Sequence, residues 1–162
     1  MHGRKILGID AGRVNVGVCL IDTSNPSRPV YWANECILKA SKPKQEEIEQ
    51  AIFSWITSER IKSLMNTADV IILESQIQKV YAVFNTYIRA RYFAKVKVVA
   101  PVTIRAAFKL PATRKEKKKD TVDKVKRKIV LPVQKGKKDD LCDAYLLALW
   151  EVGPDAVHNF LQ

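Results

Sequence analysis

Four acidic residues stand where their carboxylates could share a metal ion. Asp10 closes a short apolar run, and Glu74 follows four consecutive apolar residues. Asp140 and Asp143 are three residues apart in an apolar segment, so a helix would place them on one face. A carboxylate at the tip of a buried strand is costly unless it is paired or bound to a metal. The pattern therefore indicates a shared site.

The chemistry that fits these residues is metal-assisted hydrolysis of a phosphodiester. Carboxylates, water and substrate phosphate are the oxygen ligands that Mg²⁺ or Mn²⁺ prefers. Two ions about 3.5–4 Å apart can activate a water molecule and stabilise the leaving oxygen. Divalent cations would also remove the repulsion between converging acids. We expect two Mg²⁺ ions per site, replaceable by Mn²⁺, and no small-molecule cofactor.

Each acid also has an ordinary structural explanation. Asp10 could hold the turn that follows it, and Glu74 could pair with a lysine. Asp139 and Asp140 could be acids at the start of a helix, where the helix dipole favours them. Taken singly, each explanation is about as good as the functional one, but together in a basic chain they are less convincing.

The charge of the chain predicts a polyanionic partner. The 28 Lys and Arg residues outnumber the 17 Asp and Glu residues, which gives a formal net charge of +11. Nucleic acid is the first candidate and an anionic membrane surface the second, although some proteins are basic for solubility alone. Positive charge is concentrated at residues 114–128 and 134–138. The residues predicted to contact phosphates are Arg105, Arg114, Lys115, Lys117, Lys118, Lys135, Lys137 and Lys138.

Cysteine, histidine and hydropathy restrict the setting. Cys19, Cys36 and Cys142 are few, odd in number and widely spaced, so we expect reduced thiols in an intracellular compartment. His2 and His158 lie near opposite ends, which argues against a histidine-ligated metal. The sequence has no apolar run of 18 or more residues, so we expect no membrane span, and it has no signal-peptide pattern. With nucleic acid as the first candidate, we expect no membrane partner.

The elements predicted to position the acids begin with strands and continue with alternating strands and helices. Three early strands joined by turns predict an antiparallel opening, and the later alternation predicts a parallel extension covered by helices. Without a linker, residues 1–162 read as a single domain. The predicted strands are 5–10, 14–22, 30–40, 70–73 and 95–101, and the predicted helices are 44–65, 78–93, 103–108, 119–130 and 139–150, with a basic loop before residue 119.

The predicted helix 78–93 is apolar over much of its circumference. Val80, Tyr81, Val83, Phe84 and Tyr87 occupy more than the one stripe that a core needs. The surplus favours a subunit interface, and therefore a homodimer, although core packing alone explains it about as well.

Five short motifs occur in a fixed order along the chain. They are Asp-Ala-Gly-x-x-Asn at 10–15, Leu-Glu-x-Gln at 73–76, Ala-Pro-Val at 100–102, Lys-Lys-x-Thr-Val at 118–122 and Asp-Asp-x-x-Asp at 139–143. The ordered set resembles the RuvC branch of the ribonuclease H-like nucleases, and most closely the Holliday junction resolvases of poxviruses and other large DNA viruses. The resemblance covers residues 6 to 150.

The resemblance implies an α/β fold, with a mixed five-stranded sheet flanked by helices, that acts as a homodimer on branched DNA with four-way junctions. Its activity would be that of a Mg-dependent endodeoxyribonuclease that makes symmetric cuts. Asp10, Glu74, Asp140 and Asp143 match the metal-binding acids of the family. Lys119 matches a basic catalytic residue, and the adjacent Lys118 is the second choice for that role. The site of action would be the viral replication site in the cytoplasm, or the host nucleus.

Two departures from the bacterial members concern the turn after the first acid and the junction centre. This chain has Asp-Ala-Gly where they have Asp-Pro-Gly, and Ile77 stands where they carry a junction-probing aromatic residue. Arg105 falls where they carry a lysine. Tyr81 or Phe84 could take the aromatic role, although packing is the simpler use of both.

Three other functions fit parts of the pattern. A related nuclease could act on RNA–DNA hybrids or flaps, and an inactive DNA-binding module could keep the fold without the chemistry. Residues 8–22 also resemble the first phosphate loop of actin-type and sugar-kinase-type ATPases. Those proteins need two such domains, for which this chain is too short.

Overall fold

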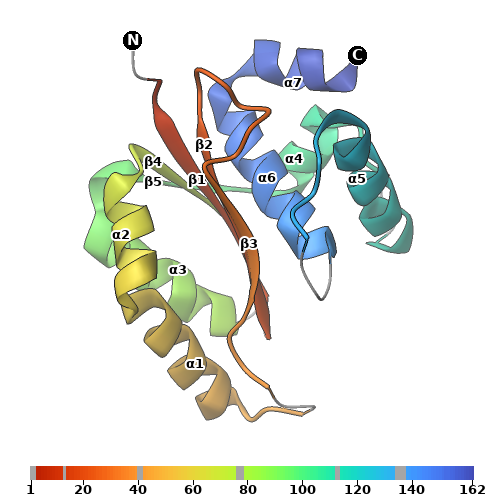
Figure 1. Ribbon diagram of the computed structural model, residues 1–162. Helices are drawn as coiled ribbons and strands as arrows, with labels where there is room; N and C mark the ends of the chain where they lie inside the picture. The colour runs from red at the N-terminus through yellow and green to blue at the C-terminus, as the bar shows by residue number, and fades with distance from the viewer. Residues whose placement is uncertain (1–2, 13, 40–41, 76–78, 112–113, 134–137) are drawn as a thin grey trace.

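The chain forms a mixed five-stranded sheet with helices on both faces, as Figure 1 shows. The computed structural model describes residues 3–12, 14–39, 42–75, 79–111, 114–133 and 138–162. The strands are β1 (Lys5–Ala11), β2 (Asn15–Asp22), β3 (Tyr31–Cys36), β4 (Val70–Glu74) and β5 (Val96–Val99). The helices are α1 (Gln45–Thr57), α2 (Glu59–Thr67), α3 (Lys79–Tyr92), the short η1 (Phe93–Lys95), α4 (Pro101–Ala107), α5 (Arg114–Lys128), α6 (Lys138–Val152) and α7 (Pro154–Leu161).

The order of the strands across the sheet is β3-β2-β1-β4-β5. β2 is antiparallel to β1 and to β3, whereas β4 is parallel to β1 and β5 is parallel to β4. Short turns can join antiparallel strands, but parallel strands need a crossover, and helices supply it here. The predicted antiparallel opening and parallel extension are both confirmed.

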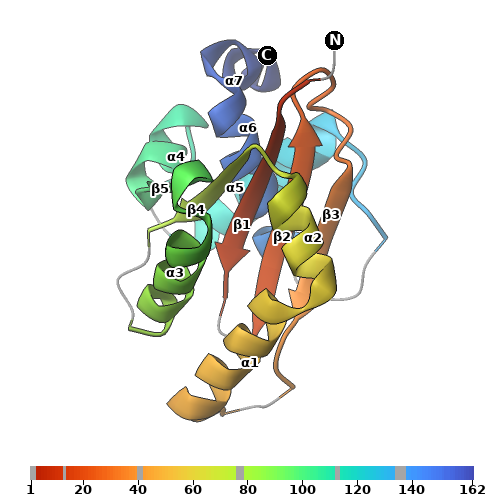
Figure 2. The same ribbon diagram turned by 90° about the vertical axis from the view of Figure 1, so that its left-hand side faces the viewer.

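Alternate residues of each strand face two separate apolar layers. Leu7 and Ile9 of β1 pack with α1, α2 and α3, which lie in front of the sheet in Figure 2. Ile6 of β1 and Ile72 of β4 pack on the opposite face with α4, α5, α6 and α7. The largest share of that second layer comes from α6, whose residues from Ala144 to Leu149 are all buried. Every second residue of β1, counted from Ile6, therefore faces α6.

Two predicted elements differ from the structure. The predicted helix 44–65 is divided, because Ser58 is extended (ψ 143°) between α1 and α2. The break allows both Ile56 and Ile61 to be buried against the sheet. The predicted basic loop was wrong for residues 114–118, which form the first turn of α5. Lys, Arg and Glu are good helix formers, but their run carries no apolar period that would reveal a helix.

The last helix, α7, was not predicted from the sequence. Gly153 precedes it with φ 129°, a backbone conformation that favours glycine, and Pro154 is its first residue. Phe160 of α7 packs edge-on against Phe108, with their ring centroids 5.5 Å apart. The helix thus closes one end of the second apolar layer.

Candidate active site

Asp10 and Glu74 lie at the carboxyl ends of adjacent parallel strands. Ile9 of β1 pairs in register with Leu73 of β4, and the two acids directly follow this pair. Asp10 is four residues after Ile6, and Glu74 is two residues after Ile72. Because alternate residues of a strand share a face, both acids project on the face of the sheet that α6 covers. The side-by-side placement that the sequence predicted for these two acids follows from this register.

The start of α6 lies directly over the strand beside Asp10. Gly17 of β2 is the cross-strand partner of Asp10. A Cβ atom at Gly17 would lie 2.0 Å from the backbone oxygen of Asp140, so a side chain there would collide with the helix. Gly8 of β1 lies in the same way against the backbone oxygen of Ala144, at 2.1 Å. Two glycines therefore allow α6 to approach the sheet closely at the level of Asp10.

The orientation of α6 turns its acids away from β3. Tyr145 contacts the ring of Trp32 on β3, with ring centroids 5.2 Å apart. Successive residues of a helix are rotated by about 100°, so Asp143 lies on the opposite flank from Tyr145. Asp140 lies on the same flank as Asp143. That flank faces the β1–β4 side of the sheet, where Asp10 and Glu74 end.

The chemistry and placement of these acids suit a hard divalent cation, which prefers oxygen ligands. The Oδ1 atom of Asp143 is shielded from solvent, unlike that of an acid at an open helix start. Among the residues that the structure describes, however, no three His, Cys, Asp or Glu side chains already stand around a common point as metal ligands. The backbone places the four acids near the carboxyl ends of β1 and β4. That their carboxylates together hold metal ions stays a prediction.

The predicted basic residues are only partly brought to this edge. Lys119 is exposed on α5 and, with Lys118 and Lys138, lines a shallow groove of about 460 Å³ between α5 and the start of α6. Lys118 forms an ion pair with Asp139, so Asp139 joins the start of α6 to α5.

The other predicted phosphate contacts do not line this groove or are not described. Arg105 is partly buried near the end of α4. The residues that lie outside the described ones, in whole or for their side chains, are Arg114, Lys115, Lys117, Lys135 and Lys137, and Ile77 also lies outside them.

The predicted aromatic substitutes for Ile77 are core residues. Tyr81 and Phe84 are 7% and 1% exposed, and Phe84 stacks on Trp55 with ring centroids 5.7 Å apart. Packing, which was the simpler of the two uses, is thus the one that the structure shows.

The cysteine within the acidic motif of α6 is inert. Burial, followed by the charges of Asp143 and Asp139, raises the pKa of the Cys142 thiol to about 12. Burial also raises the pKa of Cys19. Neither is a ready thiolate nucleophile, because the thiolate is the reactive form. The carboxylates remain the groups with chemistry to offer at this edge.

Sequence reasoning missed Gly17 and Trp32, which position the start of α6. The indole N–H of Trp32 donates a hydrogen bond to the backbone oxygen of Leu141 at 2.8 Å. A glycine inside a β-branched strand is the signal that could have been read, because it often marks a close approach by another backbone. The contact of Trp32 has no sequence signal.

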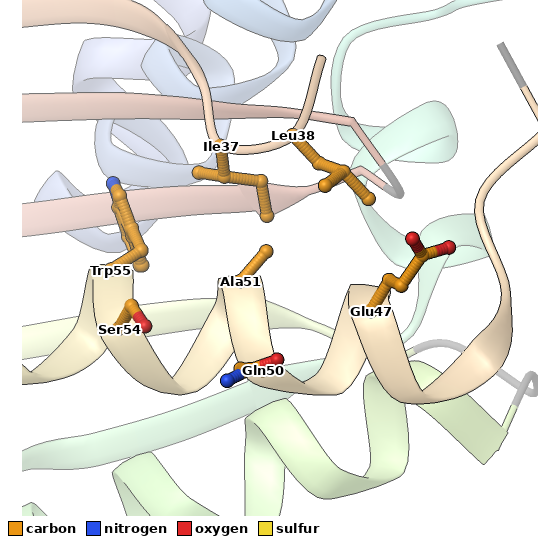
Figure 3. A pocket seen from close by; sticks show the side chains of 7 residues that line it. All are labelled: Ile37, Leu38, Glu47, Gln50, Ala51, Ser54 and Trp55. Atoms are coloured by element: carbon orange, nitrogen blue, oxygen red, sulfur yellow. The ribbon is translucent and has the colours of Figure 1, made fainter. Parts of the chain in front are cut away.

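A second groove lies on the other side of the sheet. It has a volume of about 570 Å³ and runs between residues 37–38 and α1, and the side chains of Ile37 and Leu38 are turned towards α1 (Figure 3). Trp55 closes one end, and the Glu47 carboxylate near the other end accepts a hydrogen bond from the Lys44 backbone N–H. Among the described residues, no basic side chain lines it, and so it is unsuited to phosphate.

Comparison with known proteins gives a family and a fold. The family model of the poxvirus A22 protein matches residues 4–152 of the chain. The solved complex of the fowlpox virus resolvase with its substrate Holliday junction DNA is similar at a TM-score of 0.64 and 18% identity, over 91% of this chain and 96% of that one. The complex of T. thermophilus RuvC with a Holliday junction substrate is similar at a TM-score of 0.56 and 14% identity, over 97% of this chain and 93% of that one.

At these identities the solved structures establish the shared fold. The ribonuclease H-like architecture implied by the sequence motifs is therefore confirmed. No curated protein sequence matches the chain significantly. Within the described residues, no helix is both long and apolar enough to cross a membrane.

Proposed function

Because the chain belongs to the poxvirus A22 protein family, we propose that it is an endonuclease that resolves four-way DNA junctions by hydrolysing phosphodiester bonds. Two of the solved structures that share its fold are resolvase complexes with Holliday junction DNA. The observation that carries the proposal is the placement of Asp10 and Glu74 on adjacent strand ends, below the helix that bears Asp140 and Asp143. We propose residues 1–162 as one nuclease domain.

In this proposal Asp10, Glu74, Asp140 and Asp143 hold two Mg²⁺ ions, and Mn²⁺ can replace them. When bound, such ions supply an activated water and stabilise the charge on the leaving oxygen. Cations held by these carboxylates would neutralise the repulsion between the acids and the scissile phosphate, so the phosphate could bind at the carboxyl ends of β1 and β4. Lys119, exposed on the groove beside them, places its ammonium group where charge develops on the phosphate.

The basic residues around the groove bind the DNA backbone. Lys119 and Lys138 are exposed at its rim, and α5 ends in Lys126, Arg127 and Lys128, which are also exposed. Contacts of this kind position DNA without reading its sequence. Affinity for a junction should therefore fall steeply as salt is raised.

The outward face of α3 supports a homodimer. Tyr81, Phe84 and Ile88 are buried in the monomer, but Val83 is 46% exposed. Phe93, in η1 directly after α3, is 77% exposed. Apolar residues on the solvent side of one helix are typical of a subunit interface. A two-fold dimer would place two cuts symmetrically across a junction.

The test is cleavage of a labelled four-way junction, a linear duplex and an RNA–DNA hybrid in Mg²⁺. We expect paired nicks in the junction by the wild type. Asp10→Asn should bind the junction without nicking it, whereas Asp155→Asn, an exposed acid of α7, should cut normally. Preferred cutting of the hybrid would favour the related hybrid nuclease, and full cutting by Asp10→Asn would overturn the assigned site. By this proposal the enzyme acts at the viral replication site in the cytoplasm.

A further inference from the structure

The first turn of α6 is held by contacts from three other elements. Lys118 of α5 forms an ion pair with the carboxylate of Asp139. Trp32 of β3 donates its indole N–H to the backbone oxygen of Leu141. The backbone oxygen of Asp140, between these two residues, packs against β2 at Gly17. Three successive residues are thus fixed from α5, β2 and β3.

The ion pair with α5 matters for the position of that helix, because few apolar contacts hold the first half of α5. Among its described side chains before residue 121, none is buried. The buried residues of α5 are Thr121 and Val125, both 0% exposed. The side chains of Lys118 and Asp139 are 37% and 13% exposed, so their pairing is only partly screened by water. This pair therefore sets how the first half of α5 lies against α6.

We propose that Asp139 is a positioning residue that acts through Lys118, and that it is not an ion ligand. By fixing Lys118, Asp139 holds the next residue, Lys119, beside the phosphate that the acids bind. The inference rests on the proposed function. It also gives Lys118 an intramolecular task in place of the DNA contact expected from the sequence.

The experiment measures single-turnover cleavage of a four-way junction at saturating protein. Asp139→Asn and Lys118→Gln should each lower the cleavage rate about 10- to 100-fold, because a displacement of about 1 Å near the reacting atoms costs about that much. The affinity for the junction, measured by fluorescence anisotropy in Ca²⁺, should change less than about threefold. The Mg²⁺ concentration that gives half-maximal rate should not change.

Reversal of the pair separates positioning from other roles. The double variant Lys118→Asp/Asp139→Lys should cut at least about tenfold faster than Asp139→Lys alone, because the ion pair is restored. Calorimetric affinity for Mn²⁺ should be unchanged in Asp139→Asn and lost in Asp140→Asn. Asp155→Asn and Lys42→Gln are matched exposed controls and should behave as the wild type.

Three outcomes would overturn the inference. Weaker Mn²⁺ binding by Asp139→Asn would make Asp139 a ligand. Weaker, salt-dependent junction binding by Lys118→Gln would make Lys118 a phosphate contact. Failure of the reversed pair to recover activity, with both proteins folded by circular dichroism, would remove the positioning role. A wild type that cuts no junction would instead refute the proposed function.

Discussion

Replacement of Gly17 by alanine tests whether the close approach of α6 to the sheet builds the site. The added Cβ would lie 2.0 Å from the backbone oxygen of Asp140 and 2.6 Å from its carbonyl carbon. Cβ atoms keep at least about 3.0 Å from such atoms, so the first turn of α6 must retreat by about 1 Å. The colliding atoms are backbone, and no side-chain rotation can relieve the overlap.

The magnitude follows from that retreat. Overpacking of this kind costs about 1–3 kcal/mol in the free energy of unfolding. A displacement of about 1 Å at Asp140, relative to Asp10 opposite Gly17, should lower the rate of junction cleavage about 100-fold. The loss of rate should thus exceed anything that the modest loss of stability explains.

The assay combines urea unfolding with single-turnover cleavage at a temperature where the variant is folded. Ile61→Val is the control, because it should cost about 0.5–1.5 kcal/mol in α2, on the other face of the sheet, without moving α6. Its cleavage rate should equal that of the wild type. A folded Gly17→Ala protein that cuts as fast as the wild type would refute the link between this contact and the site.

Three further predictions concern the rest of the molecule. Arg60→Met should lower the free energy of unfolding by about 2 kcal/mol in urea denaturation, because the mostly buried Glu35 carboxylate then keeps, among the described residues, the donors Tyr31 and Trp55 alone. Lys62→Met, at an exposed pair, should cost less than about 0.5 kcal/mol, and equal losses in the two variants would contradict this reasoning. Burial, followed by the hydrogen bond and charge of Glu35, raises the pKa of Tyr31 to about 12, so the folded protein keeps a proton that the unfolded chain loses near pH 10; stability should fall between about pH 10 and 12, and less steeply in Tyr31→Phe. At pH 8 an aromatic disulfide reagent should label one thiol of the native protein, the exposed Cys36, and none in Cys36→Ser; rapid labelling of Cys19 or Cys142 would contradict their burial.

The strands and the acids that end them could be predicted from the sequence, because both leave a local pattern. Asp10 and Glu74 each close an apolar run, and the motif order gave the ribonuclease H-like fold. The break at Ser58 and the start of α5 could not be predicted in this way. The first depends on burial of both neighbouring helices against one sheet, and the second lies in a charged run without apolar periodicity.

The contacts that position α6 depend on residues far apart in the chain. Trp32 and Leu141 are 109 positions apart, and Lys118 and Asp139 are 21 apart. Nothing in the sequence near either member of a pair indicates its partner. The four acids are a prediction from the sequence, and the fold shows what holds the helix of Asp140 and Asp143 in place.

Anomalous diffraction from crystals soaked in Mn²⁺ can show whether Asp10, Glu74, Asp140 and Asp143 together bind divalent cations. We expect anomalous peaks within about 2.0–2.5 Å of carboxylate oxygens from all four residues. Peaks at other residues, or carboxylates that stay apart in saturating Mn²⁺ with no peak between them, would contradict it.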